Sequence, residues 1–247
     1  MAPRVVVLSL ASDFGCQVQI TNMEDHILDV LGLIDLSFWQ LVSSGDMPAD
    51  YDVAIIEGAV TTEDHVALLK EARETAGAVV AIGSCAVTGG IPAMANLAGL
   101  EKRYAAVYGD GTPVAPGRRA PLPIGSFIEV DYHVPGCPID TDEFMRVLSR
   151  ALRGLSDHVP DMTMCASCKI AENVCFYDSG VVCLGLVTRA GCDAKCPSLG
   201  RPCTGCRGIA PDANLESART VLTKHGRDPI ELDELLRVYN AAREVRV

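Results

Sequence analysis

Eight of the eleven cysteines fall within residues 165–206, and their spacing indicates metal binding. Taken in order they form two groups of four, and each group contains one Cys-x-x-Cys pair. This spacing lets two thiolates face one ion or cluster across a tight turn. The two predicted ligand sets are Cys165, Cys168, Cys175 and Cys183, and then Cys192, Cys196, Cys203 and Cys206.

Two kinds of metal suit these thiolate sets. Four thiolates form an acceptable tetrahedral zinc site, so two structural zinc ions are one interpretation. Soft thiolates equally suit iron–sulfur clusters. Proline directly follows Cys137 and Cys196, as it follows the last cysteine of bacterial ferredoxin runs. Composition therefore favours iron–sulfur and leaves zinc open.

The remaining three cysteines are far apart in sequence, so only the expected fold can bring them together. Runs of β-branched and apolar residues at 4–10, 52–58, 78–82 and 128–134 are typical of strands buried on both faces of a parallel sheet. Helices are expected at 62–76 and 141–155. Strand alternating with helix predicts right-handed βαβ units and an α/β, doubly wound parallel sheet.

Such a sheet does its chemistry at the carboxyl ends of its strands, where a third ligand set is expected. Asp13 and Cys16, Glu57, Cys85 and Cys137 each follow a predicted strand. The alternative is three inert buried thiols and an aspartate that only caps a loop. If Asp13 is counted, the chain supplies twelve ligands, which is the number that three four-iron clusters need.

Composition excludes several functions. The chain has 247 residues and a formal charge of −11, with no basic run longer than Arg118-Arg119, which disfavours nucleic acid and anionic membranes. Residues 76–100 carry no charge, but five glycines and a proline indicate a buried strand and a loop rather than a membrane span. The odd cysteine count and the lack of a signal peptide predict a cytoplasmic protein without a disulfide framework.

The chain is expected to divide near residue 158. Beyond Pro160 the periodicity disappears, so residues 1–158 are predicted to form the α/β domain and residues 159–247 a small Cys-rich domain with few regular elements. The second domain should close with a helix at 213–224 and another that opens with the capping box at 228–231.

Several motifs resemble the small subunit of [NiFe] hydrogenases. They are Asp-Phe-Gly-Cys at 13–16, Glu-Gly-Ala-Val at 57–60, Gly-Ser-Cys-Ala with Gly-Gly-Ile within 83–91, and Pro-Gly-Cys-Pro at 135–138. The run from Cys183 to Cys192, with the later Lys-Cys-Pro and Arg-Pro-Cys-Thr-Gly-Cys, is similar to the cytoplasmic branch of that family. This branch includes the δ subunit of sulfhydrogenase and the γ subunit of F420-reducing hydrogenase.

The resemblance implies a flavodoxin-like domain with a proximal [4Fe–4S] cluster, followed by a domain with a medial and a distal [4Fe–4S] cluster. The proximal ligands would be Asp13, Cys16, Cys85 and Cys137, with Asp13 standing where the common pattern has a cysteine. The distal ligands would be Cys165, Cys168, Cys175 and Cys183. The medial ligands would be Cys192, Cys196, Cys203 and Cys206.

The function implied by the resemblance is electron transfer. Electrons from H2 oxidation at a nickel–iron site in a separate large subunit would pass through this chain to flavin- and iron–sulfur-containing subunits that reduce NAD(P)+. The chain has no G-x-G-x-x-G nucleotide motif of its own. Glu57 matches the family's Glu-Gly motif near the proximal site and is expected either to relay protons or to accept a loop N–H.

Three other interpretations remain. One is the γ-type subunit of an F420-reducing hydrogenase. Another is the related subunit of a quinone-reducing respiratory complex, which the eight downstream cysteines disfavour. The third is a zinc-held interaction module with no redox role.

Overall fold

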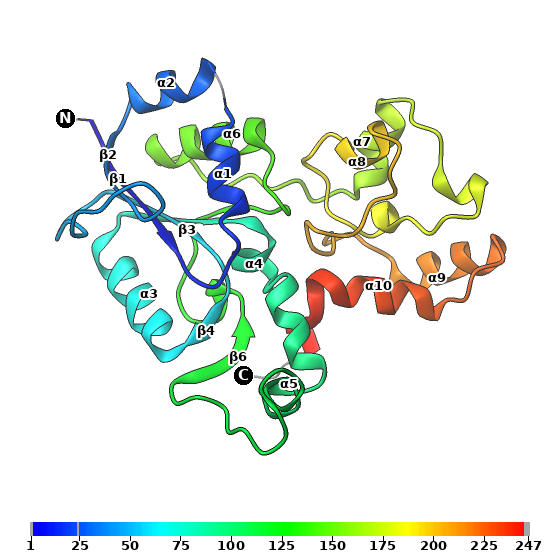
Figure 1. The fold of residues 1–247 in the computed structure, drawn as a ribbon. Coiled ribbons are helices and arrows are strands. Elements are labelled where there is room, and N and C mark those ends of the chain that lie inside the picture. The colour runs from blue at the N-terminus through cyan, green and yellow to red at the C-terminus, as the bar shows by residue number, and fades with distance from the viewer. Residues whose placement is uncertain (1, 24, 245–247) are drawn as a thin grey trace.

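A five-stranded parallel sheet forms the centre of the larger part of the molecule (Figure 1). This computed structural model describes residues 2–23 and 25–244. The strands are β1 (Arg4–Ser9), β2 (Asp35–Trp39), β3 (Val53–Glu57), β5 (Ala78–Ile82) and β7 (Tyr132–Val134), in the spatial order β2-β1-β3-β5-β7. This is the flavodoxin-like order, and it confirms the predicted fold class.

Helices cover both faces of the sheet because successive side chains of each strand point to opposite sides. Val5 and Val7 of β1 face one apolar cluster, and Val6 and Leu8 face the other. The first face is covered by α1 (Gly15–Thr21), α2 (Asp25–Leu31) and α6 (Thr141–Leu152). The second face is covered by α3 (Glu63–Thr75) and α4 (Gly83–Thr88).

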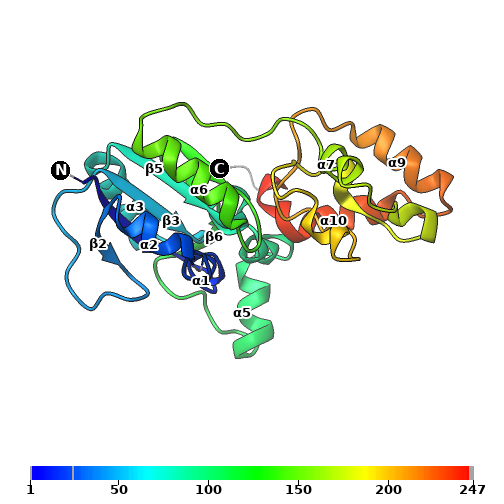
Figure 2. The same ribbon diagram turned by 90° about the horizontal axis from the view of Figure 1, so that it is seen from above.

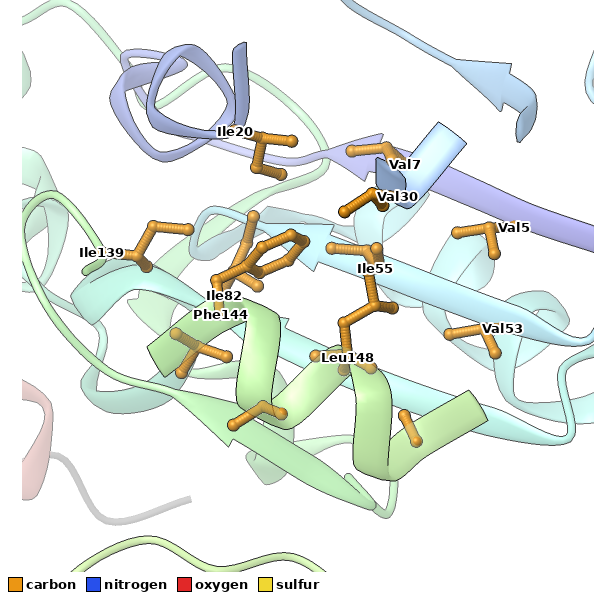
Figure 3. Close-up of a cluster of buried hydrophobic side chains, with 14 of the residues drawn as sticks. Val5, Val7, Ile20, Val30, Val53, Ile55, Ile82, Ile139, Phe144 and Leu148 are labelled. Atoms are coloured by element: carbon orange, nitrogen blue, oxygen red, sulfur yellow. The ribbon is translucent and has the colours of Figure 1, made fainter. Parts of the chain in front are cut away.

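Figure 3 shows the first of these clusters from the side of α6. Phe144 and Leu148 of α6 lie against Ile55 and Ile82 of the central strands. The helix begins where the Asp140 side chain accepts a hydrogen bond from the Glu143 N–H at 3.0 Å, a favourable N-cap. The packing of α6 therefore fixes the chain directly after the Pro-Gly-Cys-Pro motif.

The stretch from residue 83 to residue 122 differs from the prediction. The expected loop after β5 contains α4, a 3-10 helix (η1, Ile91–Leu97) and α5 (Leu100–Tyr108). The Gly- and Pro-rich sequence of residues 108–125 predicts an irregular connection, but this stretch includes β6 (Arg118–Leu122), which pairs antiparallel with β4 (Val60–Thr62). Glycines at positive φ separate these short elements. Each helix is therefore too short to show a clear helical repeat of apolar residues in the sequence.

The Cys-rich segment has few regular elements, as predicted. It contains α7 (Met164–Ile170), α8 (Lys195–Ser198) and the 3-10 turns η3 (Phe176–Ser179) and η4 (Leu184–Leu186). Two longer helices follow, α9 (Leu215–Lys224) and α10 (Ile230–Asn240), and then η5 (Ala241–Glu244). Another 3-10 turn, η2 (Ile124–Ser126), precedes β7.

The Cys-rich segment also has an apolar cluster of its own. Leu222 of α9 and Leu232 of α10 are fully buried against Met164 and Leu184. Figure 2 shows this part of the chain beside the sheet domain, with α10 reaching back to it. In residues 2–23 and 25–244, no helix is long and apolar enough to cross a membrane.

Candidate metal centres

The carboxyl ends of three strands bring Cys16, Cys85 and Cys137 together. Ser9, Glu57 and Ile82 are register partners at the ends of β1, β3 and β5. The three cysteines follow β1, β5 and β7, two of them in the first turns of α1 and α4. Burial raises the pKa of the Cys85 thiol to about 12, and the charges of Cys137, Asp13 and Glu57 act in the same direction.

The same causes act on the other two thiols of this group. Burial raises the pKa of Cys16, as do the charges of Glu57, Cys137 and Cys85. Burial also raises the pKa of Cys137, although a hydrogen bond from the Tyr239 side chain opposes that shift. We call Asp13, Cys16, Cys85 and Cys137 the proximal set. Its members are mutual electrostatic neighbours, as the strand-end argument predicted.

Asp13 lies at the exposed rim of the proximal set. Its Oδ1 accepts a hydrogen bond from the Gly15 N–H at 2.9 Å, the local turn that aspartate commonly makes. In the structure the Asp13 side chain therefore caps its own loop, which is the alternative to binding iron. The aspartate also stands close enough for its charge to act on Cys85 and Cys137.

Glu57 belongs to a buried chain of hydrogen bonds. Its Oε1 accepts from the Cys16 N–H at 3.0 Å, and its Oε2 accepts from Gln17 Nε2 at 2.9 Å. Gln17 Oε1 in turn accepts from Trp39 Nε1 at 2.7 Å. Burial raises the pKa of Glu57, while these donors oppose the shift. Both carboxylate oxygens therefore hold the loop that carries Cys16.

The second ligand set gathers around Cys165, which lies in the first turn of α7. Burial raises the pKa of this thiol to about 11, and the charges of Cys183, Cys168 and Cys175 raise it further. All four predicted members are therefore neighbours. We call Cys165, Cys168, Cys175 and Cys183 the distal set. Cys183 is buried and Cys175 is exposed, so the set spans from the interior to the surface.

The third ligand set lies between the other two. Burial raises the pKa of Cys206 to about 11, and the charges of Cys192 and Cys196 also raise it. Burial likewise raises the pKa of Cys203 to about 12, where the charges of Cys183 and Cys206 contribute. We call Cys192, Cys196, Cys203 and Cys206 the medial set.

The donor sets consist of thiolates with one carboxylate, and thiolates bind both zinc and iron–sulfur clusters. Thiolates around one zinc ion would stand roughly 3.8 Å apart, given tetrahedral bonds of ~2.3 Å. No group of three or more His, Cys, Asp or Glu side chains in the described residues is arranged to hold one metal ion. A four-iron cluster binds each of its thiolates at a different iron.

The backbone is strained in the loops that carry these ligands. Within the described residues, the non-glycine residues at positive φ are Phe14, Glu172, Asp193 and Ala194. Phe14 precedes Cys16 in the proximal loop, Glu172 precedes Cys175, and the other two separate Cys192 from Cys196. Such conformations cost energy and persist where surrounding interactions impose them, often at functional sites.

Contacts between neighbouring residues connect the three sets in series. The Cys137 backbone lies close enough to the Cys206 thiol to lower its pKa, so the proximal set adjoins the medial set. The Cys203 N–H donates to Cys183 Sγ at 3.2 Å and joins the medial set to the distal set. The Ser84 hydroxyl also donates to the Cys206 carbonyl oxygen. The spatial order is therefore proximal, medial, distal.

A buried ion pair holds the medial set against the proximal loop. Arg207 donates from Nη1 and Nη2 to the Glu143 carboxylate at 2.6 Å each, with 1% and 5% of the two side chains exposed. The same guanidinium donates to the carbonyl oxygens of Pro135 at 2.6 Å and Ala190 at 3.0 Å. It therefore clamps α6, the Cys137 loop and the chain before Cys192 to one another.

Comparison with known proteins identifies the family. Residues 14–151, more than half of the chain, match the family model for the NADH ubiquinone oxidoreductase, 20 Kd subunit. Sulfhydrogenase 2 subunit delta of Pyrococcus furiosus is 32% identical, over 87% of this chain and 90% of that protein. A subunit of the vhu F420-non-reducing hydrogenase of Methanocaldococcus jannaschii is 31% identical, over 97% and 94%. This chain belongs to the [NiFe] hydrogenase small-subunit family.

Solved structures agree with this assignment. The NAD+-reducing [NiFe]-hydrogenase in its H2-reduced state has a chain that is 29% identical and superposes with a TM-score of 0.55, over 65% of this small subunit and 96% of that chain. The [NiFeSe]-hydrogenase of Desulfomicrobium baculatum is 18% identical with a TM-score of 0.61 and bears on the fold alone. The small subunit is thus an iron–sulfur electron-transfer protein of the hydrogenase type.

Sequence reasoning missed three residues that complete the site. Arg207 and Glu143 are 64 residues apart and carry no motif. Tyr239 contacts Cys137 from α10, more than a hundred residues downstream. The only available signal was an arginine directly after the last cysteine and a glutamate three residues after the Asp140 cap, and either is common on protein surfaces.

Gly83 provides a test of the proximal set. A Cβ at this position would lie 2.5 Å from Cys16 Sγ, and its φ is +83°. We expect Gly83→Ala to displace Cys16 and to lower the amount of iron bound by the purified protein. The control is Gly154→Ala, because Gly154 also has positive φ but nothing within 4 Å of its Cβ. Equal iron content in the two variants would contradict the placement of Cys16.

Proposed function

We propose that this small subunit relays electrons from the nickel–iron site of a partner large subunit, through three [4Fe–4S] clusters, to a flavin-containing subunit that reduces NAD(P)+. The observation that carries the proposal is the serial connection of the three cysteine sets. The Ser84 hydroxyl, next to Cys85, donates to the Cys206 carbonyl oxygen, and the Cys203 N–H donates to the Cys183 sulfur. Short covalent and hydrogen-bonded paths of this kind favour a chain of redox centres over isolated structural metals.

Each ligand set would hold one cluster. When bound, the clusters supply one-electron redox centres whose potentials depend on ligand type, hydrogen bonds to sulfur and solvent exposure. Burial by the chain keeps water from Cys16, Cys183 and Cys203. The Cys203 N–H donates to the Cys183 sulfur and would raise the distal potential, because it stabilises the more negative, reduced state.

Glu57 is proposed to position the Cys16 loop rather than to relay protons. Both of its oxygens are occupied, one by the Cys16 N–H and one by the Gln17 amide, and 2% of the residue is exposed. A proton relay needs an oxygen directed toward the next carrier. The contacts of Glu57 support a structural role.

The proposal also includes the organisation and surroundings of the protein. The α/β domain would comprise residues 1–158 and the iron–sulfur domain residues 159–247, each with its own apolar cluster. The partners would be a [NiFe] large subunit and flavin- and iron–sulfur-containing subunits, all in the cytoplasm. The 29% identical chain comes from an NAD+-reducing hydrogenase, which supports NAD(P)+ as acceptor.

A second candidate acceptor is coenzyme F420. The gamma chain of the coenzyme F420 hydrogenase of Methanococcus voltae is 24% identical over 78% of this chain. Purification of the native complex with H2-dependent assays of NAD+, NADP+ and F420 reduction distinguishes the acceptors. Iron and sulfide analysis distinguishes both proposals from a zinc-held module: we expect about twelve irons per chain, and zinc in their place would refute the relay.

Substitutions of Asp13 decide whether it ligates iron. Asparagine keeps an acceptor for the Gly15 N–H but is a poor iron ligand, so Asp13→Asn should lose proximal iron only if Asp13 is a ligand. Asp13→Cys should keep all three clusters and shift the potential of one. Electron paramagnetic resonance redox titration measures both effects. Wild-type iron content and potentials in both variants would show that Asp13 only caps its loop.

A further inference from the structure

Apolar side chains are unusually exposed beside the distal set. Ile170, Val174 and Leu199 expose 83%, 78% and 73% of their surface, and no large apolar residue in the described chain is more exposed than the first two. We call these three residues the Ile170 patch. Exposed apolar groups that gather in one place mark interaction sites more often than scattered ones do.

A hydrogen bond between two loops brings the Ile170 patch together. Asn173 Nδ2 donates to Ser198 Oγ at 3.0 Å, which places Val174 and Leu199 on neighbouring loops. Cys175 directly follows Val174, and Cys196 lies one turn before Leu199. Both of these thiols are exposed. The patch therefore lies where a distal and a medial ligand reach the surface.

The charge around the Ile170 patch is opposite to that of the whole chain. The formal net charge is −11, yet three exposed cations, Lys169, Lys195 and Arg201, lie here against two exposed acidic residues, Glu172 and Asp193. Lys195 forms an exposed ion pair with Asp140 at 3.3 Å, which leaves Lys169 and Arg201 as the main cations. The local surface is apolar and cationic.

A groove continues from the same surface. A hollow of about 740 Å³ lies between α6 and the Cys-rich segment, and Ile170 and Met162 line it. Arg146 and Arg150 line it too, which adds two positive charges to this surface. Of its two acidic lining residues, Glu143 is already neutralised by Arg207.

We propose that the Ile170 patch and this groove dock an acidic redox protein that takes electrons from the distal set. This inference rests on the proposed relay. The step is a one-electron transfer: the distal centre is oxidised by one electron, a flavin or iron–sulfur centre of the partner is reduced by one, and no bond forms or breaks. Apolar residues at the centre and cations around them fit a partner with a carboxylate-rimmed apolar face.

A second copy of this chain fits the surface poorly. In a symmetric dimer the same patch meets itself. Lys169, Lys195 and Arg201 would then oppose their own copies, and like charges across an interface cost affinity. An acidic partner gains from the same cations, and its association should depend on salt.

The test uses the native complex, purified without oxygen through a tag on this chain. The variants are Lys169→Glu/Arg201→Glu for the charge and Ile170→Ser/Leu199→Ser for the apolar contact. We expect each pair to reduce the retained acidic redox chain at least tenfold in about 0.1 M salt, and wild type to lose it in about 1 M salt. Iron content and H2-dependent reduction of methyl viologen, a dye that needs no docking surface, should not fall.

The matched control is Lys102→Glu/Arg103→Glu, which reverses two exposed charges on α5. It should retain the complex. The docking proposal is overturned if the patch variants retain the acidic chain, or if they lose the large subunit instead. It is also overturned if the variants only abolish a complex between two copies of this chain, which would lower the mass of the purified protein. A wild-type complex that contains iron but no acidic redox chain also overturns it. Failure of the relay itself is recognised separately, by a wild-type chain without iron.

Discussion

Arg207→Met is expected to destabilise the protein by about 3–5 kcal/mol, because it leaves the Glu143 carboxylate buried without a partner. The substitution also removes donors from the carbonyl oxygens of Pro135 and Ala190. In a chain of this size the midpoint of thermal unfolding should fall by roughly 6–20 °C. Anaerobic thermal denaturation followed by circular dichroism measures it.

Two further variants separate the charge of Arg207 from its clamp function. Glu143→Gln keeps the shape of the carboxylate but leaves the guanidinium unpaired, so it should also be strongly destabilised. Arg219→Met is the control, because the Arg219–Asp233 pair is 39% and 43% exposed and should contribute under about 1 kcal/mol. If Arg207→Met behaves like Arg219→Met, the clamp does not hold the two parts together.

Removal of iron is expected to open the Cys-rich segment while the sheet persists. The helices α7 and α8 have only seven and four residues, too few to be stable alone. The strained residues Glu172, Asp193 and Ala194 lie in the same loops. Metal-bound thiolates contribute to folding directly, by roughly 10 kcal/mol or more in structural zinc sites.

Limited proteolysis with mass spectrometry of the fragments measures this opening. After chelation of the iron, cleavage within residues 165–206 should accelerate at least tenfold, whereas cleavage within β1, β3 and β5 should not. The internal comparison within one sample is the control for protease activity. Similar protection of the segment with and without iron would show that the apolar cluster around Leu222 and Leu232 is sufficient to hold it.

Much of the fold was predictable because its signals are local. Buried strands appear as short β-branched runs, so β1, β3 and β5 were predicted within a residue or two of their ends. Helices α4 and α5 were missed, because η1 and several positive-φ glycines interrupt them and leave α4 only six residues long. Strand β6 was missed because its partner β4 has three residues and gives no periodic signal.

The candidate site, like the fold, was only partly predictable from the sequence. Cysteine spacing predicted two groups of four thiols, and strand ends predicted that Cys16, Cys85 and Cys137 meet; the thiols of each group are neighbours in the structure, and their role as iron ligands stays a prediction. The role of Asp13 as a ligand stays a prediction, since its observed contact is with the Gly15 N–H.

The sequence by itself determined which residues could bind metal and that parallel strands would carry some of them to one edge, because spacing and periodicity act over a few residues. Only the tertiary structure decided the hydrogen bond from Cys203 to Cys183, the Arg207–Glu143 clamp and the apolar surface beside Cys175. These features join side chains 20 to 72 residues apart. Their contacts depend on how whole elements pack, and no local pattern encodes them.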